Sequence, residues 1–304
     1  MSDNYLERSQ VYKVFLKFLI TNQKIDTYNI PELNHWLSVN DLTVEQEYYL
    51  LKILSKAQYY TEDQIIYGYK YLIEEYLIPY IICNLTSLDY PKNFINNPLS
   101  YCDFNFREIL ENILFIPLSS EEKPDESGNH ISRILTKNQI ISNHQLAFIK
   151  NAIKSKAWEK YKYIVIIDDG IGTGQQIKDF LKTDEMKLLM SKLESPKLLI
   201  NTTLLAHEKG LNHVDKNIFS IFLDKYDISH RVFSINSIYW ERGERDKAQK
   251  CLGDLAKDRG LKLRGRDNLG CSIFISKTIP NWTLPLFWMK TPNWEPLVHR
   301  GNSQ

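Results

Sequence analysis

Two adjacent aspartates followed by a glycine-rich turn are the residues of this sequence best suited to chemistry. The stretch YKYIVIIDDGIGTGQQIKDFLK runs from Tyr161 to Lys182 and places Asp168 and Asp169 after an apolar segment that ends at Ile167. Carboxylates at the end of a buried strand can bind the hydroxyl groups of a sugar. Glycines allow positive φ and close backbone approach, so the amide N–H groups of the turn can surround an anion such as phosphate.

The turn predicts a phosphate-binding loop that leads into a helix. The free amides and the positive dipole end of that helix should face the same turn, and the Thr173 hydroxyl adds a donor. Two carboxylates beside a phosphate would repel it, whereas a sugar phosphate can place its hydroxyls on the carboxylates and its phosphate in the loop. The residues expected to shape such a loop are Gly170, Gly172, Thr173 and Gly174.

Other interpretations of the same stretch stay open. No Gly-Lys-Ser/Thr follows the turn, and the glycines alternate with single residues after the acids, so it is neither a Walker A loop nor a dinucleotide fingerprint. The acidic pair could instead cap the next helix or form a Walker B-like metal site. Taken alone, the residues of this stretch favour a ligand site over helix capping or a Walker B-like metal site.

The elements that must position this loop alternate along the last two thirds of the chain. Helical patterns occur at 138–158, from about Gly174, and from Glu244 to Gly260. The apolar, strand-like runs are Asn112–Leu118, Tyr163–Ile167, Lys197–Ala206, Arg231–Trp240 and Cys271–Lys277. Such alternation predicts an α/β fold with a parallel sheet, in which ligands bind at the carboxyl ends of the strands.

The first third of the chain is predicted to be helical. Thr43 with Gln46, and Thr61 with Gln64, have the spacing of capping boxes at helix starts. An apolar stripe follows the second box, and Pro79 should end or kink that helix. We therefore predict a small helical domain over residues 1–95, a Pro- and Asn-rich connector near the boundary, and a second domain over residues 96–304.

Composition indicates a globular protein of the cytoplasm. The chain has 304 residues, of which 43% are hydrophobic and 25% charged, with a net charge of +1. This balance gives no general reason to expect nucleic acid or membrane binding. The N-terminus is polar rather than a secretory signal, and no apolar run is long enough to span a bilayer. The four cysteines contain no CxxC pair, so reduced thiols are expected.

The loop resembles the ribose-phosphate signature of type I phosphoribosyltransferases, and the residues IVIIDDGIGTGQQI carry that resemblance. It is more similar still to the phosphoribosyltransferase-like proteins of bacterial conflict systems, including those encoded beside retron reverse transcriptases. The segment DESGNHISRIL resembles this subgroup through Ser127 and Gly128. The closing stretch 279–300 resembles it through Asn281, Leu284, Pro285, Trp288, Trp294, Pro296, Leu297 and Arg300.

This resemblance implies a type I phosphoribosyltransferase-like parallel sheet with flanking helices, preceded by the small helical domain. It implies that the catalytic pair Asp168 and Asp169 binds the ribose 2′ and 3′ hydroxyls. It also implies that the 5-phosphate is held by the ligand-binding turn Gly170, Ile171, Gly172, Thr173, Gly174, Gln175 and Gln176. The early loop would bind pyrophosphate through Ser127, Gly128 and Asn129. Mg²⁺ would be the cofactor, bound through the pyrophosphate and the ribose hydroxyls, with no protein metal ligand predicted.

The resemblance further implies an effector of an antiphage system, acting by phosphoribosyl transfer or by nucleotide or N-glycosidic hydrolysis. A retron reverse transcriptase with its msDNA, or another defence protein, would be the partner. The alternative is a non-catalytic nucleotide-binding sensor or scaffold. The chain departs from ordinary members at Gln175 and Gln176, where they carry a small residue and then Ser or Thr. The nearest basic residue to the early Ser-Gly segment is Arg133.

Three weaker features have a structural and a functional interpretation. The tryptophans Trp282, Trp288 and Trp294 could stack on a base or pack a closing segment against the sheet. His207 and His213 are six residues apart and do not match a metal motif. The basic segment 245–266 fits a solvated helix face, or a pyrophosphate or RNA contact.

Overall fold

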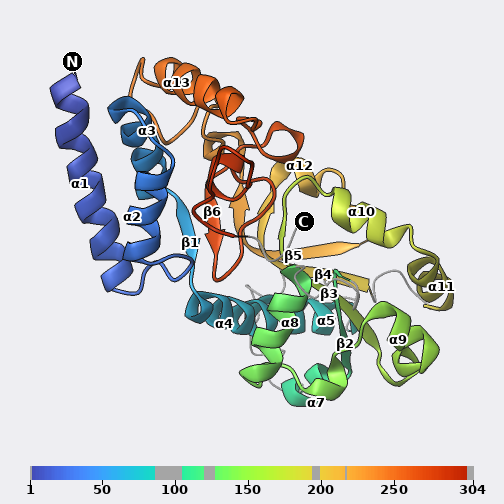
Figure 1. Cartoon of the computed structure of the whole chain (residues 1–304). Coiled ribbons are helices and arrows are strands. Elements are labelled where there is room, and N and C mark those ends of the chain that lie inside the picture. The colour runs from blue at the N-terminus through green and yellow to red at the C-terminus, as the bar shows by residue number, and fades with distance from the viewer. Residues whose placement is uncertain (1, 86–104, 120–126, 194–198, 216–217, 300–304) are drawn as a thin grey trace. The chain divides into compact units, whose positions relative to one another are not determined.

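The computed structural model describes residues 2–85, 105–119, 127–193, 199–215 and 218–299. The chain forms two compact units (Figure 1). Unit 1 combines residues 1–63 with residues 226–304, and unit 2 consists of residues 64–225. The domain boundary predicted at residues 95 and 96 lies outside the described residues and stays a prediction.

Unit 2 is built on a four-stranded sheet with the order β2-β3-β4-β5. The strands are β2 (Ile113–Pro117), β3 (Tyr163–Ile171), β4 (Leu199–His207) and β5 (Phe219–Tyr226). β3 pairs in parallel with β2 on one side and with β4 on the other. Every residue of β2 and β4 is buried, as expected for parallel strands covered on both faces. The predicted α/β fold with a parallel sheet is confirmed.

Short helices accompany this sheet: α7 (Phe106–Glu111), α8 (Ser127–Lys137), α9 (Ile149–Lys154), α10 (Gln175–Leu181), α11 (Asp184–Lys192) and α12 (Glu208–Leu211). The helix expected across residues 138–158 is wrong in its length. That region holds 3₁₀ turns at Asn143–Gln145 and Ala157–Lys160 on either side of α9. Gln139 and Lys156 have positive φ, which a continuous right-handed helix does not allow.

The predicted N-terminal helical region is present. It contains α1 (Ser2–Thr21), α2 (Ile30–Val39), α3 (Val44–Ser55), α4 (Glu62–Tyr71), a π-helical turn (Leu72–Leu77) and α5 (Ile78–Leu85). The capping box of Thr43 and Gln46 begins α3. Pro79 does not end the helix, because the chain passes without a break from α4 through the π-helical turn into α5, where Pro79 is the second residue.

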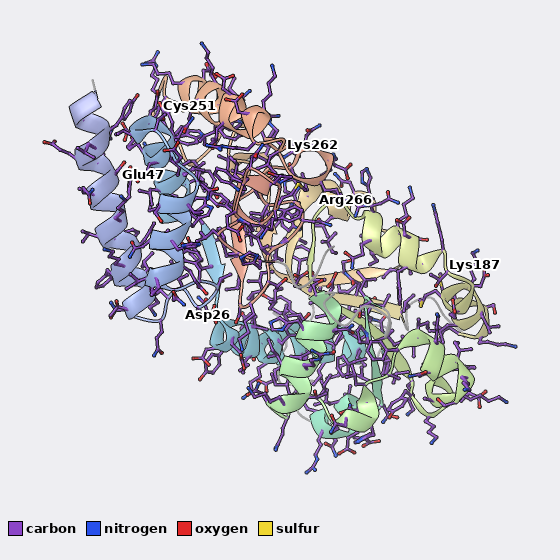
Figure 2. All side chains as sticks on the ribbon, viewed as in Figure 1. Asp26, Glu47, Lys187, Cys251, Lys262 and Arg266 are labelled. Atoms are coloured by element: carbon purple, nitrogen blue, oxygen red, sulfur yellow. The ribbon has the colours of Figure 1, made fainter. Side chains whose placement is uncertain are left out.

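Side chains tie the helices of unit 1 to their neighbours. Glu47 of α3, labelled in Figure 2, pairs with Lys13 of α1 at 2.9 Å. Asp26, labelled near the start of α4, accepts a hydrogen bond from the Glu62 amide at 2.9 Å. Among the described helices, none is both long enough and apolar enough to cross a membrane. Cys251 and Cys271 are free thiols, while Cys102 lies outside the described residues.

The C-terminal segment of unit 1 contains the helix predicted from Glu244 to Gly260 but differs from the prediction in its strands. It contains α13 (Arg245–Asp258) and β6 (Ile273–Ile275), and β6 pairs in parallel with β1 (Gln58–Tyr60), so the predicted last strand belongs to a separate sheet. The run Arg231–Trp240 follows a 3₁₀ turn at Ile228–His230 and forms turns and bends instead of a strand. In this run the Val232 carbonyl accepts from the Ser237 hydroxyl at 2.7 Å and from the Trp240 indole N–H, bonds that favour a compact turn.

Candidate functional site

The acidic pair lies inside β3, not after it. The sequence predicts a strand that ends at Ile167, but β3 continues to Ile171. Asp168 pairs with Thr203 of β4, and the pairing with β4 extends to Ile171. β2 ends earlier, at Pro117, which is the register partner of Ile167. The two carboxylates therefore sit where β3 extends past one neighbouring strand and still pairs with the other.

Both carboxylates are buried. Asp168 is 1% exposed and Asp169 is 6% exposed, so little of either carboxylate reaches solvent. The reason is the extension of β3, together with the start of α8. Ser127 is the first residue of α8, and its hydroxyl donates a hydrogen bond to Oδ1 of Asp168 at 2.5 Å.

Ser127, Gly128 and Asn129 form the first turn of α8 directly beside the acidic pair. A Cβ on Gly128 would lie 2.9 Å from the Leu118 backbone nitrogen, so glycine allows α8 to approach the end of β2. Asn129 is buried, and its Oδ1 accepts from the Ser119 hydroxyl at 2.7 Å. Two stretches that lie about forty residues apart in sequence, each predicted to contact one ligand, therefore meet at Asp168.

Burial changes the electrostatics of the pair. Desolvation, and then the neighbouring Asp169 carboxylate, raise the pKa of Asp168 well above its ordinary value, although the Ser127 hydrogen bond opposes this. Two carboxyl groups this close titrate as a pair. Asp168 consequently keeps its proton to a higher pH than an exposed aspartate would.

The glycines of the loop serve close packing as well as conformation. Gly174 has a φ of +76°, and a Cβ there would lie 2.6 Å from the carbonyl oxygen of Gly210 in α12. A Cβ on Gly210 would in turn lie 2.6 Å from the Gly172 carbonyl oxygen. The loop backbone thus rests directly on the backbone of α12. His213 adds a hydrogen bond of 2.9 Å between its Nδ1 and the Thr173 carbonyl.

The two glutamines after Thr173 and Gly174 form side-chain hydrogen bonds within the chain. The side-chain amide of Gln175 donates to Asp179 at 2.6 Å, and that of Gln176 donates to the Leu118 carbonyl at 3.2 Å. Thr173 is buried, and its hydroxyl accepts a hydrogen bond from the backbone N–H of Gln175 at 3.3 Å. Gln176 therefore links the loop to the end of β2 and, through it, to the start of α8.

Tyr69 is a site residue that sequence analysis missed. It lies in α4, is fully buried, and donates from its hydroxyl to the backbone carbonyl of Asp168 at 2.6 Å. In the sequence it is one member of an apolar helical stripe, so its spacing predicts packing alone. Gly210 and His213 were missed for a similar reason, because their segment was considered only as a metal motif. Among the described residues, no group of three or more His, Cys, Asp and Glu is placed to hold a metal ion.

Comparison with known protein families shows to which family the chain belongs. A sequence model of the PRTase-CE family matches residues 33–300, which covers most of the chain. The chain belongs to the PRTase-CE family. No curated protein and no solved structure matches it. The PRTase-CE match supports a phosphoribosyltransferase-like protein, and its range includes the acidic pair, the loop and Ser127–Asn129.

The closing segment of the PRTase-CE match packs into unit 1. Trp282 and Trp294 are buried, and the Trp294 indole N–H donates to the Leu286 carbonyl at 2.9 Å. The Trp288 indole N–H donates to the Thr283 carbonyl at 3.1 Å. These contacts favour the packing interpretation of the three tryptophans over a base-stacking pocket. His207 is also buried, and its Nδ1 accepts from the Lys209 amide at 3.1 Å.

Proposed function

We propose that this PRTase-CE protein binds a ribose phosphate or nucleotide at Asp168, Asp169 and the Gly170–Gln176 loop. The hydrogen bond between Ser127 and Asp168 carries the proposal, because it joins the predicted pyrophosphate segment to the predicted ribose segment. A phosphoribosyl donor has its pyrophosphate and its ribose hydroxyls on adjacent carbons. A site for it needs these two protein segments within a few ångströms of each other.

The reaction is phosphoribosyl-type transfer or N-glycosidic hydrolysis. In either case the bond from C1 of ribose to its leaving group breaks, and the ring acquires positive charge that a nearby carboxylate stabilises. Asp169 would supply that carboxylate, while the raised pKa of Asp168 suits it to donate a hydrogen bond to a ribose hydroxyl. Ser127 holds the Asp168 carboxyl in place, and Tyr69 holds its backbone.

Mg²⁺ would enter this site together with the ligand, bound to the ligand's own oxygens. The described residues offer no cluster of three protein ligands, so the metal would be held by pyrophosphate and ribose oxygens with the acidic pair nearby. When bound it would neutralise the leaving pyrophosphate. The protein's own part is to orient the ribose so that C1 meets its nucleophile, which is an acceptor group in transfer and a water molecule in hydrolysis.

We place this chemistry in an antiphage defence system of the retron type, where the protein would be the effector. The resemblance of the loop, the Ser-Gly segment and the closing stretch to such proteins supports this role. A reverse transcriptase with its msDNA would be the partner. Expression with and without the neighbouring genes, followed by phage challenge, tests it; protection that survives the Asp168→Asn/Asp169→Asn change would contradict a catalytic effector.

A second candidate function is a non-catalytic sensor or scaffold that binds a nucleotide. The burial of both carboxylates and the raised pKa of Asp168 favour it, because a neutral, enclosed carboxyl stabilises less positive charge. Incubation of the full chain and Mg²⁺ with phosphoribosyl pyrophosphate, followed by ³¹P NMR, separates the two. Pyrophosphate release that falls about a hundredfold or more in the folded double variant supports catalysis. Binding without turnover supports the sensor.

A further inference from the structure

Unit 1 contains a pocket that the proposed reaction does not use. It has a volume of about 400 Å³, within the usual range for small-molecule sites. We call it the α1–α13 pocket, because α1, the start of α13 and the turn before α13 contribute most of its wall. It is lined by Asn4, Tyr5, Arg8, Tyr49, Glu241, Arg242, Gly243, Glu244 and Lys247.

A buried ion pair fixes one wall of the α1–α13 pocket. Lys52 is 1% exposed and its Nζ lies 2.5 Å from Oε2 of Glu244, while the Tyr48 hydroxyl donates to Oε1 at 2.7 Å. Burial opposes ionisation of Glu244, but the hydrogen bonds from Lys52, Tyr48 and the Glu241 backbone, together with the charge of Lys52, lower the pKa of that carboxyl. Glu244 is therefore ionised and already neutralised by Lys52. The ion pair preorganises the turn that precedes α13 and adds no net charge to the pocket.

The remaining charges of the pocket are mostly positive. Arg8, Arg242 and Lys247 line it, against the single carboxylate of Glu241, which is 68% exposed in its side chain. Within the described part of the chain, neither Arg242 nor Lys247 has an ion pair or a side-chain hydrogen bond. Arg8 pairs with Glu241 at 3.3 Å and lies 5.5 Å from the centre of the Tyr48 ring, which orients its guanidinium.

The backbone of the pocket also favours an anion. Gly243 has a φ of +80°, and nothing lies within 4 Å of the position that a Cβ would take, so a ligand can approach the turn. α13 has 14 residues, and its N-cap residue Glu244 makes no side-chain capping bond. The positive dipole end of α13 therefore adds to the field of the three cations.

We propose that the α1–α13 pocket binds a small phosphate ester, at a site separate from the acidic pair of unit 2. Planar guanidinium groups form paired hydrogen bonds with phosphate oxygens, which suits Arg8 and Arg242. The volume exceeds what inorganic phosphate needs and accommodates a sugar or nucleoside attached to it. The Tyr5 and Tyr49 hydroxyls, 3.3 Å apart, lie on the wall where such a group would add hydrogen bonds.

Isothermal titration of the full chain carrying Asp168→Asn and Asp169→Asn tests the proposal, because those changes impair the other proposed site. The probes are adenosine 5′-monophosphate and ribose 5-phosphate, with adenosine as the control that lacks phosphate. Both phosphate esters should bind and adenosine should not. Affinity should fall as salt rises, because exposed charges are screened. Failure of both esters to bind, or equal binding of adenosine, would overturn the proposal.

Matched variants locate the site. Arg242→Ala with Lys247→Ala should weaken both esters about tenfold or more, the usual effect of losing hydrogen bonds to a charged group. Lys257→Ala is the control, since it removes an exposed cation from the last turn of the same helix. Circular dichroism melting confirms that each variant is folded. Equal affinities for the double variant and for Lys257→Ala would also reject the proposal, whatever the outcome at the acidic pair.

Discussion

Replacing Gly174 by alanine tests how the loop is built. Its φ of +76° costs an L-residue about 1–2 kcal/mol. The new Cβ would also lie 2.6 Å from the Gly210 carbonyl oxygen, a backbone atom that moves only if α12 moves. Overpacking of this kind costs about 1–3 kcal/mol. The expected loss is therefore about 2–5 kcal/mol of unfolding free energy, as the sum of the two.

Two other glycines separate the conformational and steric effects. Gly260 has a φ of +70° with nothing within 4 Å of its Cβ position, so Gly260→Ala should lose only the conformational part, about 1–2 kcal/mol. Gly210→Ala should lose the steric part, because its Cβ would lie 2.6 Å from the Gly172 carbonyl oxygen. Gly210 does not have the positive φ of the other two.

Urea unfolding followed by circular dichroism measures all three variants, with binding of ribose 5-phosphate as a second measurement. Gly174→Ala should be the least stable and should lose the binding event at the loop, since the loop must shift away from α12. Binding at the α1–α13 pocket should remain. Gly260→Ala should keep binding. If Gly174→Ala costs no more than Gly260→Ala, the contact between the loop and α12 does not constrain the loop, and the reasoning fails.

Three further substitutions probe the acidic pair. Asp168→Asn should stabilise the protein at neutral pH. Because the pKa of Asp168 is raised in the folded protein, the unfolded chain releases this proton at lower pH, so wild-type stability falls as pH rises above the ordinary aspartate pKa. Urea midpoints at pH 4 and pH 7 should show the gain only at pH 7. Ser127→Ala should raise the pKa of Asp168 further, because the Ser127 hydrogen bond lowers it, and an NMR titration of the carboxyl carbon that shows no rise would contradict the contact. Tyr69→Phe should cost about 1–3 kcal/mol, since it removes a donor from the buried Asp168 carbonyl, and an unchanged melting midpoint would count against that role.

The parts of the fold that sequence predicted are those set by local patterns. The five-residue apolar run before Asp168 fixes a buried strand, and the Thr43–Gln46 spacing fixes the start of α3. Ser127 and Asp168 were each assigned to one ligand from separate motifs, and parallel strands bring their carboxyl ends to one edge, so their meeting follows from topology.

Contacts between distant segments could not be predicted in the same way. The extension of β3 depends on β4 continuing to pair with Gly170 and Ile171, and glycines usually indicate a turn there. Gly210 approaches the loop closely although it lies in a different element, so its importance has no local signature. The association of residues 226–304 with residues 1–63 joins the two ends of the chain, which neither periodicity nor composition encodes.

The most direct test of the central claim is calorimetric titration of ribose 5-phosphate into three full-length proteins: wild type, Asp168→Asn/Asp169→Asn, and Arg242→Ala/Lys247→Ala. If the acidic pair and its loop bind the ribose phosphate, the Asp double variant should stay folded and lose the binding event that the Arg242→Ala/Lys247→Ala protein retains. Equal binding of ribose 5-phosphate by wild type and by the folded Asp double variant would contradict that claim.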